Sequence, residues 1–127
     1  MRIKLKDRKE TDKIVTNITI GNWYLVRGKP TKITPANVVW AFRDGCFPVP
    51  LTSEILENSG IHREGGASFW HDEHYSIVFF FWNEEKIELI ISKRGDDRPY
   101  IAKLDVKYVD QLQDLLRVYN INLMIEL

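Results

Sequence analysis

The chain has 127 residues, with 18 lysines and arginines against 18 aspartates and glutamates, and 44% of its residues are hydrophobic. This length fits one ordinary domain, and the apolar fraction is typical of a folded protein rather than a disordered one. The single cysteine excludes a disulfide framework and a structural zinc site made of cysteines, and the zero net charge argues against a strongly basic nucleic-acid-binding protein.

The charges are unevenly distributed along the chain. Residues 1–50 carry ten positive and four negative charges, a balance of +6, whereas residues 51–127 carry eight positive and fourteen negative charges, a balance of −6. The change falls at Pro48-Val49-Pro50, where proline favours an extended chain. We therefore expect a single domain, 1–127, made of a basic part, 1–50, and an acidic part, 51–127, whose opposite charges attract each other.

The sequence predicts a cytoplasmic protein without a membrane span. The N-terminus is charged throughout and lacks the apolar region of a secretory signal. The longest apolar run, Ile77 to Trp82, has six residues, far below the roughly 20 that a transmembrane helix needs. In that compartment Cys46 is expected to be reduced.

Short segments separated by turn residues predict strands in the N-terminal part. The β-branched run 14–20 suits a strand, and 23–26 and 31–34 flank an Arg-Gly-Lys-Pro turn as a hairpin. Residues 35–42 fit either a helix, since Thr34 precedes Pro35, or a strand. We expect a small, strongly bent β-unit of SH3-like type.

The remaining segments predict a helix, a meander and a second helix. Thr52 as N-cap and Gly60 as the residue after the helix delimit a helix over 53–59. Alternating residues predict strands 68–70, 75–82, 86–92 and 100–104, and apolar residues at helical spacing predict a helix over 109–120. Residues 121–127 alternate and suit a final strand.

Together these elements predict the α+β class. The N-terminal β-unit is followed by an antiparallel meander sheet with one amphipathic helix packed on it. The strand over 75–82 is apolar on both faces, so it is either covered twice or its outer face, with Val78, Phe80 and Trp82, meets a protein partner or a second copy.

Two polar clusters carry the residue types of a catalytic or metal site. His62, His71 and His74 have ligand chemistry for a divalent ion, although His71 and His74 lie in a predicted turn between strands. Asp96 and Asp97 form a carboxylate pair, but Gly95-Asp96-Asp97 before Arg98-Pro99 is also an ordinary turn. We interpret both as turns, with a metal-dependent hydrolase as the weakest hypothesis.

Enzyme signatures are otherwise missing from the sequence. No phosphate-cradling glycine loop, Gly-x-Ser-x-Gly elbow or His-Glu-x-x-His motif occurs, and Cys46 matches no nucleophile signature. We therefore expect no catalytic residue and no cofactor, and the sequence favours a non-enzymatic function over an enzymatic one.

The basic N-terminal part combines cations with aromatic residues. Small β-barrels bind single strands by stacking bases on aromatic rings while cations follow the backbone. The residues that fit this pattern are Trp23, Tyr24, Arg27, Lys29 and Lys32, with further cations at Arg2, Lys4, Lys6, Arg8 and Lys9. Nucleic-acid binding is thus a second hypothesis, against the alternative that Trp23 is core and the lysines are solvated.

Three segments in order resemble a family of uncharacterised small proteins encoded in gut-bacterial genomes and their prophages. The segments are Gly21-Asn22-Trp23-Tyr24, Pro48-Val49-Pro50-Leu51-Thr52-Ser53-Glu54 with its helix up to Ile61, and Val109-Asp110-Gln111-Leu112-Gln113-Asp114-Leu115. Ser59 and Ile61 replace the family's usual aromatics, and Asp110 replaces its usual histidine. The resemblance implies a phage or mobile-element accessory protein in a bacterial cytoplasm, and it brings no catalytic residue. Our first hypothesis is accordingly a non-enzymatic accessory or interaction protein.

Overall fold

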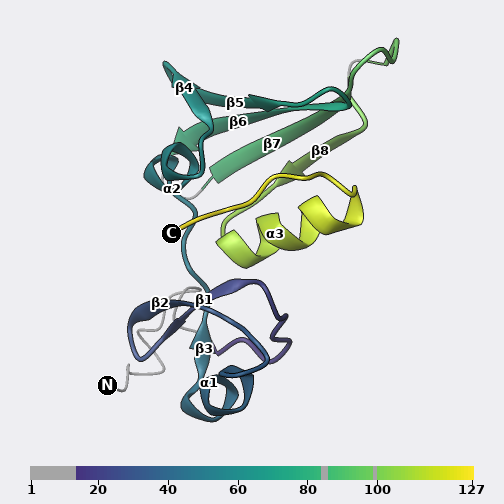
Figure 1. Cartoon of the computed structure of the whole chain (residues 1–127). Helices are drawn as coiled ribbons and strands as arrows, with labels where there is room; N and C mark the ends of the chain where they lie inside the picture. Colours follow the sequence, from purple (N-terminus) through teal and green to yellow (C-terminus); the bar gives the residue numbers. More distant parts are fainter. Residues whose placement is uncertain (1–13, 84–85, 99) are drawn as a thin grey trace. The chain divides into compact units, whose positions relative to one another are not determined.

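The structure of the chain, a computed structural model, describes residues 14–83, 86–98 and 100–127. These residues form two compact units (Figure 1). The first unit runs up to Pro50 and includes Tyr108–Asp114, and the second consists of Leu51–Lys107 and Leu115–Leu127. Helix α3 (Val109–Val118) therefore begins in the first unit and ends in the second. The basic residues before Ile14, the turn residues Glu84 and Glu85, and Pro99 lie outside the described residues.

The first unit contains a three-stranded antiparallel sheet in the order β2-β1-β3. The strands are β1 (Trp23–Val26), β2 (Lys29–Lys32) and β3 (Cys46–Phe47). Arg27 and Gly28 connect β1 to β2 with φ angles of 53° and 75°, which matches the positive φ values that a two-residue hairpin turn requires. The predicted hairpin is confirmed, although its second strand begins two residues earlier than expected.

A small apolar core lies beside this sheet. Its buried members are Tyr24, Val26, Ile33, Ala41 and Cys46, and the partly buried Val15, Ile18 and Val38 pack against them. Ala41 and Val38 come from helix α1 (Val38–Asp44), so the segment that fitted either a helix or a strand is helical. A side-chain hydrogen bond closes the polar turn that precedes α1, in which Thr34 N–H donates to Asn37 Oδ1 at 2.8 Å.

The strand expected over 14–20 is wrong for the described residues. Only Val15 forms a bridge, with its N–H donating to the Cys46 carbonyl at 2.7 Å. Ile18 packs against the core, while Thr16 and Asn17 are exposed. The β-branched segment therefore contributes a side chain to the core but does not form the strand that its pattern predicted. High β-propensity yields a strand only where a neighbour offers continuous pairing.

The second unit is built on a five-stranded antiparallel meander in the order β4-β5-β6-β7-β8. The bounds are β4 (His62–Glu64), β5 (Ala67–His71), β6 (Tyr75–Asn83), β7 (Lys86–Lys93) and β8 (Ala102–Asp105). The expected meander and the α+β class are confirmed. The edge strand β4 was not expected, because its three residues are all polar and exposed.

One face of the meander forms the core of the second unit. Ile77, Phe79, Leu89 and Ile91 are fully buried on this face. Helix α2 (Ser53–Asn58), the end of α3 and the C-terminal segment lie on this side of the sheet (Figure 1). The expected cap holds α2 in place, since Thr52 Oγ1 accepts a hydrogen bond from Ile55 N–H at 3.2 Å.

The C-terminal segment 121–127 is not a strand. Ile121, Leu123 and Ile125 are buried in alternation with exposed residues, as the pattern predicted. The described residues give this segment no sheet neighbour, and Glu126 N–H instead donates to Ser59 Oγ at 2.8 Å. None of the helices in the described parts of the chain combines the length and the apolar character that crossing a membrane requires.

Candidate functional site

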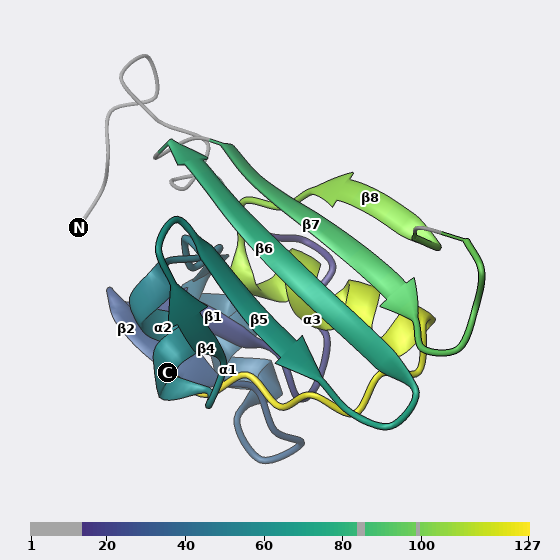
Figure 2. The ribbon, with the colours of Figure 1, turned by 90° about the horizontal axis from the view of Figure 1, so that it is seen from above.

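The opposite face of the five-stranded sheet presents apolar side chains to solvent. Because β6 side chains alternate between faces, Val78, Phe80 and Trp82 point away from the core that Ile77 and Phe79 occupy. Val78 and Phe80 are half-buried, and Trp82 is 59% exposed. Figure 2 looks onto this side of the sheet, and no described element of the second unit covers it there.

The strand register extends this apolar surface across three strands. Phe69 of β5 pairs with Val78 of β6, which pairs with Ile90 of β7. The next row across the sheet runs from Ala67 through Phe80 to Glu88. We call the set Phe69, Val78, Phe80, Trp82 and Ile90 the outer face.

Two aromatic rings of the outer face are held against each other. The rings of Phe80 and Trp82 stack with centroids 5.6 Å apart and planes 19° from parallel. A register irregularity between Phe81 and Asn83 places Trp82 at a bulge in β6. The stacked pair is thus a rigid, partly exposed anchor of the kind that dominates binding energy at protein interfaces.

Charged residues line the β8 side of the outer face. Glu88 pairs in register with Asp105, and Ile90 pairs with Lys103. Lys103 Nζ lies 3.8 Å from Glu88 Oε2, so it neutralises one of the two neighbouring carboxylates. This edge therefore carries both signs of charge beside an apolar centre, which is the usual anatomy of a protein interface.

The aromatic residues predicted to bind nucleic acid do not lie together on the surface. Tyr24 is 1% exposed in the core of the first unit, so it cannot stack on a base, and its predicted role is wrong. Its hydroxyl accepts a hydrogen bond from Thr19 N–H at 3.1 Å. Trp23 is half-buried on the other side of β1. The alternation along β1 decided which aromatic is buried.

The predicted cations of the first unit are surface residues. Arg27 lies 3.0 Å from Asp44 in an ion pair, and its side chain is 74% exposed. Lys29 is exposed and Lys32 half-buried, both on β2. These positions keep the cations available to an anionic partner, and the structure leaves nucleic-acid binding as a hypothesis that rests on them and not on Tyr24.

The structure does not assemble the three histidines with carboxylates as one metal site. His62 lies on β4, His71 at the end of β5 and His74 in the turn before β6. His71 Nδ1 lies 3.1 Å from Arg94 Nη1, so a positively charged guanidinium group stands beside this ring nitrogen, where it would repel a metal ion. Among the residues that the structure describes, no three His, Cys, Asp or Glu side chains are grouped to hold an ion.

The turn interpretation of the two polar clusters agrees with their hydrogen bonds. Asp72 Oδ1 accepts from the N–H groups of His74 and Tyr75, both at 2.7 Å. Asp96 accepts from Arg98, whose Nη2 lies 2.7 Å from Oδ2. The Arg98 side chain lowers the pKa of Asp96 to about 2. Each carboxylate thus holds its own turn together.

Cys46 belongs to the core of the first unit. It is 1% exposed, and its Sγ lies 3.5 Å from the Ala41 carbonyl oxygen. Burial raises the pKa of the thiol, which disfavours the nucleophilic thiolate. The residue therefore acts as a small apolar side chain.

The sequence analysis missed a polar cluster in the first unit. The fully buried Asn22 donates through Nδ2 to Asp114 Oδ1 at 2.9 Å. The Gln113 side chain forms hydrogen bonds with the backbone on both sides of Asn22. It accepts from Trp23 N–H at 2.9 Å and donates to the Gly21 carbonyl at 3.2 Å. The only signal in the sequence is Asn22 itself, a polar residue directly before a strand.

Comparisons of the chain with protein-family models, with curated proteins and with solved structures find no match. The site is therefore interpreted from its own geometry.

Proposed function

We propose that this chain is a non-enzymatic interaction protein that self-associates through its outer face. The observation that carries the proposal is the partly exposed set of apolar side chains on β5, β6 and β7, with the stacked rings of Phe80 and Trp82 toward the end of β6. A contiguous apolar surface of this kind on a folded unit is typical of a binding site. A second copy of the chain is the occupant that the arrangement of residues favours.

The register makes the outer face complementary to itself. One row contains Phe69, Val78, Ile90 and Lys103, and the next contains Ala67, Phe80, Glu88 and Asp105. A two-fold axis that runs across the strands and passes between the two rows places the first row of one copy against the second row of the other copy, and the reverse. Phe69 then meets Ala67 and Phe80 meets Val78, while Ile90 lies against Glu88. Each Lys103 meets the Asp105 of the other copy.

The size of the face predicts a weak dimer. Four strands at about 4.8 Å spacing and eight residues at about 3.3 Å give a flat area of roughly 20 by 26 Å, or about 500 Å² per copy. Stable dimers bury about 800 Å² per partner. We therefore expect a dissociation constant in the micromolar range, and association that depends on the aromatic anchors.

A charge-swap experiment tests the proposal. The Lys103→Glu and Asp105→Lys variants should each shift the protein toward monomer in sedimentation equilibrium, because the crossed ion pairs become repulsive. An equimolar mixture should associate again, since each repulsive residue then meets its opposite. Lys93→Glu at the end of β7 and Asp97→Lys in the loop after it serve as charge-matched controls away from the face. A wild-type protein that stays monomeric at millimolar concentration contradicts the proposal.

Nucleic-acid binding by the first unit remains the second candidate. The exposed cations Arg27 and Lys29 support it, and the burial of Tyr24 weakens it. Binding of a fluorescent single-stranded oligonucleotide should fall steeply with salt, because released counterions drive association with phosphates. The Lys29→Glu variant should lower the affinity, and the absence of any binding at low salt eliminates this function.

The cellular setting that we propose is that of a phage or mobile-element accessory protein in a bacterial cytoplasm. It rests on the order of the Gly21-Asn22 hairpin start, the Pro48-Val49-Pro50 corner with its capped helix, and the Val109–Leu115 segment. Co-transcription of the gene with recombination, replication or virion genes would support this setting. Placement in a metabolic operon contradicts it.

A further inference from the structure

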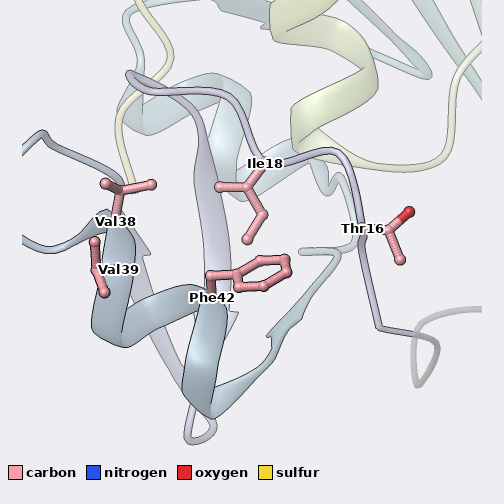
Figure 3. A pocket seen from close by; sticks show the side chains of 5 residues that line it. All are labelled: Thr16, Ile18, Val38, Val39 and Phe42. Carbon is pink, nitrogen blue, oxygen red and sulfur yellow. The ribbon is translucent and has the colours of Figure 1, made fainter.

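The first unit carries an apolar hollow of about 320 Å³ beside helix α1. Thr16 and Ile18 form one wall, and Val38, Val39 and Phe42 of α1 form the other (Figure 3). Four of these five residues are aliphatic or aromatic. The volume is that of a few side chains, so the hollow suits the apolar anchors of a peptide segment.

Helix α1 turns unusually apolar residues toward solvent. Val39 is 76% exposed and Phe42 is 63% exposed, three residues apart on the same side of the helix. Ile14 and Ile20, at the two ends of the segment that forms the other wall, are each 51% exposed. The hollow therefore lies in an apolar strip along α1 that includes the exposed Val39 and Phe42.

Two exposed cations stand at the C-terminal end of α1. Arg27 lies 3.0 Å and Arg43 lies 3.9 Å from Asp44, so two guanidinium groups share one carboxylate. Their side chains are 74% and 73% exposed, and the pair keeps one positive charge in excess at this end of the helix.

We propose that this hollow binds an amphipathic helix of a partner protein, with acidic residues beside its apolar stripe where it reaches the C-terminal end of α1. Helix α1 has seven residues, or about 10 Å, so a partner helix lying along it presents two turns of anchors. Acidic residues next to those anchors meet Arg27 and Arg43. The hollow belongs to the first unit and the self-association face to the second, so the two proposals stand independently.

A pair of designed peptides tests the charge requirement. Both have about 15 residues, long enough for an isolated helix to form, and leucines at helical spacing; one carries glutamates and the other lysines beside the leucines. Fluorescence anisotropy should show at least tenfold tighter binding of the glutamate peptide, and this preference should shrink with salt. The Arg43→Glu variant should reverse the preference. Equal binding of both peptides, or no binding of either, overturns the proposal.

A matched pair of valine variants tests the place of binding. Val39 in the hollow and Val118 on α3 are both 76% exposed helical residues, so replacing either by serine should leave the fold unchanged. Val39→Ser should weaken binding of the glutamate peptide by about tenfold or more, and Val118→Ser should not change it. Equal effects of the two substitutions contradict the hollow as the site. Neither substitution should alter the sedimentation behaviour, which separates this proposal from self-association.

Discussion

The rings of Phe80 and Trp82 stack with centroids 5.6 Å apart on the outer face of β6, opposite to the buried Ile77 and Phe79. The residue between them, Phe81, points to the opposite face, so the pair arises from the two-residue period of β6 and lies next to the register irregularity at its end. Two neighbouring aromatic rings lose little side-chain entropy when they bind, which makes them suitable anchors for a second copy.

The stacked pair should be measurable as a coupling energy. In a double-mutant cycle of Phe80→Ala and Trp82→Ala, we expect a coupling of about 0.5–1 kcal/mol in the free energy of unfolding, because offset aromatic pairs contribute beyond their buried area. The cycle is measured by urea denaturation at a concentration where the protein is monomeric. Strict additivity of the two substitutions would show that the rings do not stabilise each other.

The same anchor should control self-association. Trp82→Ser should weaken the dimer by at least tenfold in sedimentation equilibrium, since the ring is 59% exposed and stacks on Phe80 within the proposed contact. Tyr100→Ser is the control, because Tyr100 is an exposed aromatic, 45% accessible, that does not belong to the outer face. Equal effects at both positions would indicate non-specific association through exposed aromatic residues rather than a defined interface.

The capping threonine of α2 should have a specific stability effect. Thr52→Ala removes the acceptor of the 3.2 Å bond from Ile55 N–H and should lower the free energy of unfolding by about 1 kcal/mol. Thr52→Ser keeps the hydroxyl and should retain most of the stability. Thermal or urea denaturation of the three proteins measures the difference; a loss of the same size in Thr52→Ser would assign it to the methyl group instead.

The buried Asn22 should be more costly to replace than any exposed asparagine. Asn22→Ala removes the donor to Asp114 and leaves a cavity, so we expect a loss of about 2–3 kcal/mol in the free energy of unfolding. Asn58→Ala, at an exposed position near the end of α2, should change stability by less than about 0.5 kcal/mol. A small effect at Asn22 would mean that water satisfies Asp114 equally well.

Asp110 should make stability fall as the pH rises. Burial, followed by the charge of Asp114, raises the pKa of Asp110 above the ordinary aspartate value of 3.8, and its Oδ1 has no hydrogen-bond partner among the described residues. A raised pKa means that its contribution is fully present below pH 3.8 and is lost as the pH rises through the folded-state value. Asp110→Asn should therefore stabilise the protein at pH 7 more than at pH 3. Equal effects at the two pH values would contradict this assignment.

Much of the local structure follows from the sequence because it depends on neighbouring residues. Thr52 and Gly60 delimit α2, the alternation of Ile87, Leu89 and Ile91 marks β7, and the Arg27-Gly28 turn closes the first hairpin. Each of these signals lies within a few residues of the structure that it determines. The strands expected over 14–20 and 121–127 failed because a strand also needs a partner, which a local pattern does not specify.

The candidate site was only partly predictable for the same reason. The sequence indicated that Val78, Phe80 and Trp82 share a face of β6, and the structure shows that this face is the uncovered one. It could not indicate that Tyr24 is buried rather than Trp23, since both faces of β1 fit the pattern. The apolar strip along α1 was missed because residues 35–42 suited a strand as well as a helix, and a helix alone brings Val39 and Phe42 together.

The single cysteine excludes a disulfide framework, and the charge pattern divides the chain near Pro50. The tertiary structure also separates two units there, but it assigns Tyr108–Asp114 to the first of them. Gln113 and Asp114 occupy positions that the helical pattern treats as polar surface, and they hold Trp23 and Asn22 through hydrogen bonds. Periodicity determines which residues share a side of an element; only the packing of elements decides what each side meets, because burial and hydrogen-bond partners come from residues far apart in the chain.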